Sequence, residues 1–245
     1  MIRVSGICKK YGENDILKDI DFHIRKGEFT AIMGQSGCGK STLLYCVSGM
    51  DQPTAGEVYF EERKLSAFSE KEMERLRLER MGFIFQKANF LKNLSIEDNI
   101  VFPAFQAGEI SRGEIVKEAE TLMEQMGIRQ IADHDIRKVS GGQLQRAAIC
   151  RAMINHPAIL LGDEPTGALN SSATKEVMDI LNEINSRGTT VLLVTHDAKV
   201  AARADRVIYL EDGRVKENLE LGRFVKEDMA KRGDSLKIWL EKMGF

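Results

Sequence analysis

The chain has 245 residues, and 43% of them are hydrophobic, which is enough to bury one large core. Lys and Arg total 35 against 37 Asp and Glu, so the formal net charge is −2. Proteins that bind nucleic acid usually carry a basic excess, and this balance gives no support to such a partner. The cysteines show no CxxC spacing, so we expect reduced thiols rather than a zinc site or a disulfide framework.

No segment is typical of a secretory signal or a membrane span. The N-terminal stretch MIRVSGICKKYGEND contains no long apolar run. The longest apolar runs, such as TTVLLV at 189–194, are far shorter than the ~20 residues that a spanning helix needs. We therefore expect that this chain does not cross a membrane by itself.

The first part of the chain is predicted to form strands around a glycine-rich loop. Ile20, Phe22 and Ile24 alternate with polar residues, a period of two that is typical of an antiparallel strand. FTAIM at 29–33 predicts a short buried strand, and a helix is expected to follow the loop. GEVYF at 56–60 predicts a further strand.

Residues 69–157 change in character and are predicted to be helical. One helix face collects four apolar residues at helical spacing: Ile115, Ala119, Leu122 and Met126. A further helix is expected to begin at Ser140 and to end before Pro157, which cannot continue it.

Beyond residue 157, apolar strands alternate with helices. Strands are predicted at 158–162 (AILLG), 190–196 (TVLLVTH) and 206–214 (RVIYLEDGR), with a helix at about 173–186. This alternation is typical of a parallel sheet covered on both faces. The charged tail from Lys216 ends in a predicted amphipathic helix that contains Ile238, Trp239, Leu240 and Met243.

GQSGCGKST at 34–42 matches the pattern G-x-x-x-x-G-K-[ST] and stands between a predicted strand and a predicted helix. The backbone N–H groups of such a loop and the helix N-terminus form a phosphate site. Lys40 is predicted to contact the terminal phosphates and Ser41 to bind Mg²⁺. A glycine-rich structural turn would explain neither residue. For Cys38, a tolerated loop residue is favoured over a redox switch.

AILLGDE at 158–164 ends a hydrophobic strand in two acids. In P-loop folds a carboxylate at this point completes the Mg²⁺ shell, and Asp163 fits that role through water. Glu164 follows where the chain leaves the sheet, and it can act as the base for a water beside the terminal phosphate. The alternative is a pair of solvated loop acids.

Further motifs resemble those of the ABC ATPase family. VSGGQLQR at 139–146 resembles the family's signature motif, and FIFQ ending in Gln86 resembles its Q-loop. VTHD with His196 resembles the switch histidine, and Tyr11 stands where the family stacks an aromatic ring on adenine. The alternatives are a buried amide that caps a strand for Gln86 and a buried core histidine for His196.

The resemblance covers about residues 1–215. It implies an α/β fold, with a P-loop NTPase (RecA-like) core, an N-terminal antiparallel β subdomain and an inserted helical subdomain. The catalytic core would comprise 1–86 and 158–215, and the helical subdomain with the signature motif would be 87–157. Residues 216–245 would form a C-terminal helical tail that docks on the core, on a partner subunit or on a permease.

The resemblance also implies a site for ATP hydrolysis to ADP and phosphate with Mg²⁺. The catalytic residues would be Glu164, His196 and Gln86, and the residues at the metal would be Ser41, Gln86 and Asp163. The residues expected to contact ATP are Tyr11, Gly34, Gln35, Ser36, Gly37, Cys38, Gly39, Lys40, Ser41, Thr42, Ser140, Gly141, Gly142 and Gln143. Two copies would pair head to tail, with Ser140 and Gly142 of each closing over the other's ATP.

GDEPTG at 162–167, MGFIFQ at 81–86 and SGMDQPTAGEV at 48–58 resemble one branch of the family. That branch includes macrolide-export, lipoprotein-release and antimicrobial-peptide-resistance ATPases. The resemblance implies a membrane permease, supplied here by another chain, and a cytoplasmic cassette on the inner face of the cell membrane. Four apolar residues either line the permease groove or belong to the core: Phe90, Leu91, Phe102 and Phe105.

Asn170 stands where the family usually has Asp. It is either a neutral replacement that still caps the following helix or a change in communication between two ATP sites. Two other function classes are open. A soluble ABC ATPase acting on nucleic acid or ribosomes would need a coiled coil, a basic arm or a second ATPase domain. A solitary P-loop kinase would leave His196 and the signature motif without a role.

Overall fold

The computed structural model describes residues 1–244. They form two compact units, one comprising residues 1–73 with 184–244 and the other residues 74–183. The chain leaves the first unit once and returns to it, so the second unit is an insertion in the first. The domain limits inferred from the family resemblance remain a prediction.

The first unit contains an antiparallel sheet with strand order β2-β1-β4-β5. Its strands are β1 Ile2–Tyr11, β2 Asn14–Ile24, β4 Ala55–Phe60 and β5 Arg63–Lys64. Ile2 pairs with Ile24 and Val4 with Val58, and these four side chains are buried. The period of two predicted for β2 is confirmed. Ile20 and Ile24 are buried and Phe22 is half-buried, whereas Asp21 and His23 between them are exposed.

A second group of strands in this unit carries the phosphate loop. It comprises β3 Phe29–Met33, β8 Thr190–Val194, β9 Arg206–Glu211 and β10 Arg214–Glu220. β3 lies between β8 and β9 and is parallel to both, with Ala31 opposite Leu193 and Val207. Every residue of β3 and β8 is buried, which explains their short, nearly continuous apolar runs. β10 is antiparallel to β9 and is absent from the prediction, because its sequence RVKENLE is mostly polar and exposed.

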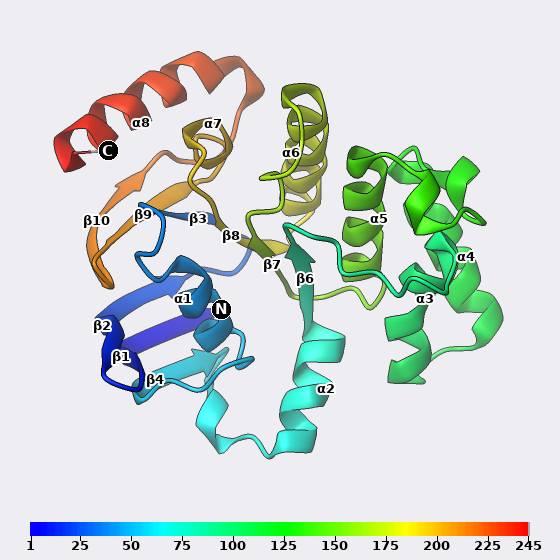
Figure 1. The fold of residues 1–245 in the computed structure, drawn as a ribbon, viewed down its shortest axis with the longest axis horizontal. Coiled ribbons are helices and arrows are strands. Elements are labelled where there is room, and N and C mark those ends of the chain that lie inside the picture. The colour runs from blue at the N-terminus through cyan, green and yellow to red at the C-terminus, as the bar shows by residue number, and fades with distance from the viewer. Residues whose placement is uncertain (245) are drawn as a thin grey trace. The chain divides into compact units, whose positions relative to one another are not determined.

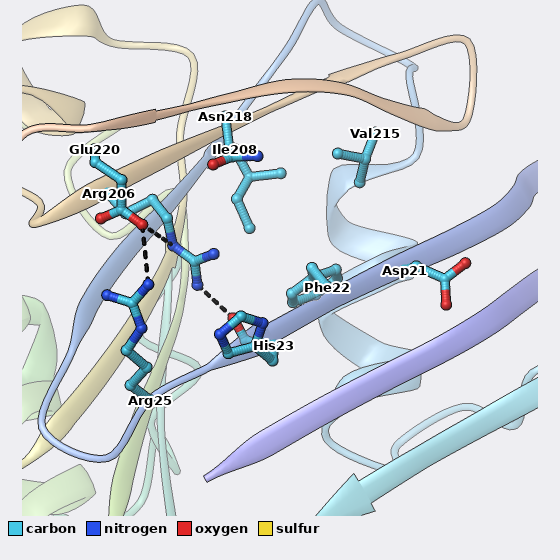
Figure 2. Close-up of a pocket in the computed structure, with 9 residues that line it drawn as sticks. All are labelled: Asp21, Phe22, His23, Arg25, Arg206, Ile208, Val215, Asn218 and Glu220. Carbon is cyan, nitrogen blue, oxygen red and sulfur yellow. Dashed lines mark hydrogen bonds and ion pairs between the residues drawn. The ribbon is translucent and has the colours of Figure 1, made fainter.

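Arg206 on β9 ties three segments of the first unit together. Its Nε donates to Oε1 of Glu28 at 2.8 Å, and its Nη2 donates to the carbonyl oxygen of His23. Glu220 accepts a hydrogen bond from Arg25 at 3.2 Å and lies 3.9 Å from Nε of Arg206. Figure 2 shows Arg206 with His23, Arg25 and Glu220 beside a cavity of about 320 Å³. None of the residues predicted to contact ATP lines it.

The C-terminal helix packs on the first unit, and Figure 1 shows it alongside β9 and β10. The helices of this unit are α1 Lys40–Val47, η1 Leu65–Ala67, α7 Ala198–Ala201, η4 Lys226–Asp228 and α8 Met229–Met243. Trp239 on α8 donates to Glu217 at 2.7 Å and meets Tyr209 edge to face, with ring centroids 6.1 Å apart. Of the three positions open for the tail, docking on the core of its own chain is therefore confirmed.

The buried face of α8 differs in part from the prediction. Trp239 and Leu240 are buried as expected, together with Leu236 and Arg232. Ile238 is 56% exposed, because it falls on the opposite face of the helix from Leu236 and Leu240.

The second unit is mainly helical around two parallel strands. Its elements are β6 Met81–Phe85, α3 Ile96–Ala107, α4 Arg112–Gln125, η2 Arg129–Ile131, η3 Ile136–Lys138, α5 Gly141–Met153 and β7 Ile159–Asp163. Two helices cross the limits of the units, α2 Glu70–Arg80 and α6 Ser171–Ser186. The four residues predicted to share a helix face are all buried. β6 interrupts the stretch predicted to be helical, because MGFIF pairs in register with ILLGD of β7. No helix within residues 1–244 is long and apolar enough to cross a membrane.

Candidate nucleotide site

The glycine-rich loop joins β3 to α1 and presents its backbone to solvent. At Gly34 a Cβ would lie 2.1 Å from the carbonyl oxygen of Leu210, so only glycine fits there. At Gly37 the backbone φ is 81°, and the space where a side chain would project is open. Gln35, Ser36 and Gly37 are exposed. A loop with an accessible backbone beside a helix N-terminus suits a phosphate group.

Lys40, the first residue of α1, is only 7% exposed. Its Nζ donates to the carbonyl oxygens of Gly34 and Gln35, both at 2.8 Å. These acceptors are neutral, so they hold the ammonium group in the loop without cancelling its charge. Gly39 precedes the helix in a left-handed conformation, with φ at 101°. The lysine charge and the helix dipole together favour an anion at this loop.

Cys38 lies in the same loop, with its Sγ 3.9 Å from Nζ of Lys40. Burial raises the pKa of the Cys38 thiol above its ordinary value, although the nearby ammonium group opposes the shift. The thiol therefore stays protonated near neutral pH, which favours a tolerated loop residue over a redox switch.

Tyr11 ends β1 and its side chain is 49% exposed. The hydroxyl group donates to Oδ2 of Asp51, and Nζ of Lys9 lies 4.8 Å from the centroid of the ring. Sequence reasoning missed the contacts of Asp51 and Lys9 with Tyr11. Tyr11 and Asp51 are 40 residues apart, and no local pattern marks the pair.

His196 follows β8 and is exposed, so the alternative of a buried core histidine is wrong. Thr195 Oγ1 accepts a hydrogen bond from the backbone N–H of Asp197 at 3.0 Å. Asp197 in turn caps α7, accepting from the N–H of Lys199 at 2.7 Å. The segment that carries His196 is thus fixed between the strand and the helix.

In the second unit, β6 and β7 bring Gln86 and Glu164 together. Phe85 pairs with Asp163, so the next residue on each strand leaves the sheet at the same end. A Cβ at Gly167 would lie 2.8 Å from Nε2 of Gln86 and 3.1 Å from Oε2 of Glu164. The two side chains therefore converge on one point, where a glycine leaves room for them. Asp163 and Glu164 are half-buried, and Glu164 has a positive φ of 47°. These features argue against a pair of freely solvated loop acids.

Ser140 caps α5 as predicted. Its hydroxyl accepts from the N–H of Gln143 at 3.3 Å, and Gln143 Oε1 accepts from the N–H of Ser140 at 2.9 Å. This capping box leaves Ser140 and Gly141 exposed at the helix N-terminus. Gly142 faces α6, where a Cβ would lie 3.1 Å from Cβ of Ala173. A second helix start suited to an anion therefore exists in the chain.

Asn170 caps α6. Its Oδ1 accepts from the N–H of Ala173 at 2.9 Å, and its carbonyl oxygen accepts from the N–H of Thr174 at 2.9 Å. The predicted capping role of Asn170 is therefore confirmed.

The apolar residues proposed for a permease groove divide into two sets. Phe90 is buried beneath Arg151, whose guanidinium lies 4.5 Å from the ring centroid. Leu91, Phe102 and Phe105 are each more than 40% exposed. Phe90 therefore belongs to the core of the second unit, and the other three are surface residues.

The donor set predicted for Mg²⁺ consists of oxygen atoms, which this cation prefers. Ser41 and Thr42 lie half-buried in the first turn of α1. In the second unit, Asp163 ends β7 and Gln86 follows β6 directly. Within residues 1–244, no group of three or more His, Cys, Asp or Glu side chains forms a metal cluster. A hydroxyl, a carboxylate and an amide oxygen fit Mg²⁺ in chemical type.

Comparison with known proteins identifies the fold and its relatives. A family model described as "ABC transporter" matches residues 17–167. The macrolide export ATP-binding/permease protein MacB of Campylobacter jejuni is 44% identical over 215 residues, which cover 88% of this chain and 33% of that protein. The chain thus spans about a third of the length of the curated relatives it matches.

Two solved structures of the bacterial ABC transporter cassette MJ0796 cover 91% of this chain and all of theirs at 38% identity. One is described as a dimer and has a TM-score of 0.85. The other is described as a dimeric post-hydrolysis state bound to ADP and Pi, with a TM-score of 0.84. The predicted fold, an α/β P-loop core with an antiparallel β subdomain and a helical insertion, is confirmed.

Proposed function

The chain belongs to the ABC transporter family, and on this premise we propose that it binds and hydrolyses ATP to power a membrane permease carried by another chain. The phosphate loop is the observation that carries the proposal. It holds a buried lysine ammonium between two neutral carbonyl groups and leaves its backbone open to solvent. Relatives that are 40–44% identical are named as export ATP-binding/permease proteins, which supports export as the direction of transport.

In this proposal each motif has one chemical task. Lys40 and the loop backbone bind the ATP phosphates, and the exposed ring of Tyr11 stacks on adenine. Ser41, Asp163 and Gln86 would hold Mg²⁺, which when bound would offset the charge of the phosphates.

Glu164 would take the proton of the attacking water. His196, which is exposed just after β8, would contact the terminal phosphate. Gly167 leaves the space in which Gln86 and Glu164 meet.

We propose that the active form is a head-to-tail dimer. The exposed N-terminus of α5, with Ser140, Gly141 and Gly142, would complete the partner's ATP site. The dimeric cassettes that match this chain support such an assembly.

The permease would dock on the second unit, where Leu91, Phe102 and Phe105 expose apolar side chains. Phe102 and Phe105 stand three residues apart on α3 and therefore share one face of that helix. The cassette would then work in the cytoplasm, on the inner face of the cell membrane. The net charge of −2 gives no support to a nucleic-acid partner.

Glu164→Gln tests the proposal. Removal of a general base slows a reaction by about a hundred-fold to ten-thousand-fold. We therefore expect the variant to bind ATP, to release phosphate at least about a hundred times more slowly, and to accumulate as a dimer with Mg²⁺-ATP in light scattering. Glu124→Gln, on the exposed side of α4, is the matched control and should behave as the parent chain. Full turnover by Glu164→Gln would remove this residue from the role of base.

A further inference from the structure

The ring of Tyr11 is held in place by two charged residues of the first unit. Its hydroxyl group donates to Oδ2 of Asp51, and Asp51 Oδ1 accepts from Nζ of Lys9 at 2.5 Å. The same ammonium group donates to the carbonyl oxygen of Gln52 at 2.7 Å and lies 4.8 Å from the centroid of the Tyr11 ring. One lysine thus neutralises the carboxylate that anchors the hydroxyl and also lies over the ring.

The arrangement joins two segments that are distant in the sequence. Lys9 and Tyr11 stand on β1, whereas Asp51 follows α1, the helix that begins at the phosphate loop. Lys9 is buried and Asp51 is partly buried, so their ion pair is screened less than a surface pair. The pair therefore fixes the exposed ring relative to the helix that carries Lys40.

The protonation states agree with this geometry. The hydrogen bond to Asp51 is the largest cause that raises the pKa of Tyr11, to about 12, while a side-chain hydrogen bond with Thr42 acts in the opposite direction. Burial raises the pKa of Asp51, but the hydrogen bonds from Lys9 and Tyr11 outweigh it and the pKa is lowered. Near neutral pH the phenol is therefore a donor and the carboxylate an acceptor.

We propose that Lys9 and Asp51 are positioning residues that hold the Tyr11 ring ready to stack on the adenine base of ATP. This inference rests on the proposed function, in which Tyr11 contacts the base. A side chain that is half exposed and unanchored loses rotamer freedom when a ligand immobilises it, and that loss weakens binding. Anchoring the hydroxyl end fixes the ring before the nucleotide arrives.

The proposal predicts that loss of the anchor weakens binding of the adenine base and leaves binding of the phosphates unchanged. Tyr11→Phe removes the hydroxyl donor of the anchor, and Asp51→Asn weakens its acceptor by removing the carboxylate charge. Both variants keep the ring. We expect each to bind ATP about three- to ten-fold more weakly in calorimetry on the full chain. Inorganic triphosphate, which lacks a base, should bind both variants as it binds the parent. The double variant should bind ATP no more weakly than the single variant with the lower affinity, because both changes act on the same interaction.

Glu220→Gln is the matched control. It breaks the 3.2 Å ion pair between Glu220 and Arg25, which belongs to the same unit but is exposed on both sides. This variant should bind ATP and triphosphate as the parent does.

Tyr11→Ala distinguishes the role of Tyr11 at the adenine base from the positioning role of Asp51 and Lys9. If it leaves ATP affinity unchanged, Tyr11 does not contact the base and the proposed role of this residue fails, and the positioning role fails with it. If Tyr11→Ala weakens ATP binding but Asp51→Asn does not, only the positioning role is overturned. If Asp51→Asn weakens the binding of ATP and of triphosphate equally, Asp51 has a general structural role, and the positioning role is again overturned.

Discussion

Replacement of Arg232 by methionine tests how the C-terminal helix is held on the first unit. Arg232 is 5% exposed, and its guanidinium donates to five backbone carbonyl oxygens of that unit. The two most buried bonds run from Nε to Ala202 at 2.8 Å and from Nη2 to Ala204 at 2.5 Å. Methionine has a similar length and fills the space, but it donates to none of these oxygens.

The magnitude follows from these bonds. A hydrogen bond from a charged donor contributes about 1.5–3 kcal/mol, so loss of the two buried bonds removes about 3–6 kcal/mol. Burial lowers the pKa of Arg232, so removing the charge also relieves part of its desolvation. We therefore expect a net loss of about 3 kcal/mol, which lowers the melting temperature by about 6–12 °C in a chain of this size.

The assay uses urea and thermal unfolding followed by the fluorescence of Trp239, the one tryptophan of the chain, which lies on α8. Lys231→Met, at the exposed neighbouring position, is the control and should shift stability by no more than about 0.5 kcal/mol. If Arg232→Met is no less stable than Lys231→Met, the tail is not held by this guanidinium and the reasoning is refuted.

Three further changes probe other parts of the chain. Gly167→Ala should lower the ATPase rate several-fold at an unchanged melting temperature, because the added Cβ displaces only the flexible ends of Gln86 and Glu164. An unchanged ATPase rate would contradict the convergence of these two side chains. Asn170→Asp keeps the cap of α6, so the melting temperature should stay the same. The basal ATPase rate or its cooperativity should change. Unchanged kinetics would show that Asn170 is a neutral replacement. Burial raises the pKa of the Asp205 carboxyl group above its ordinary value of 3.8, so the folded chain binds the carboxyl proton more tightly than the unfolded chain does. The protonated carboxyl group therefore adds to the free energy of unfolding at low pH, and this contribution is lost as the pH rises through the raised pKa. Asp205→Asn should flatten this slope in urea titrations, and an equal slope in both proteins would exclude Asp205 as its source.

Several features were predictable because their signals are local. The loop at 34–42 and the helix that begins after Ser140 depend on residues within a few positions of one another, and both are found. Asn170 was predictable as a cap for the same reason. The fully buried strands were visible as short apolar runs, since both faces of a parallel sheet are covered.

Other features depend on partners that are remote in the chain. β10 carries a polar sequence and exists because β9 offers it an edge, which no local pattern announces. Ile238 looked like part of the buried face of α8, but the helix is oriented by Trp239 and Arg232, which reach acceptors on other elements.

The sequence by itself determined the family, the fold class and the types of residue that the nucleotide chemistry requires, because short motifs encode the loop and the helix starts that bind anions. Only the tertiary structure decided which side chains meet. It brought Gln86 and Glu164 to one point beside Gly167, and it joined Asp51 to Tyr11 across 40 residues. Such contacts arise when separate elements pack on a common core, so their geometry is fixed by strand register and helix orientation rather than by neighbours in the chain.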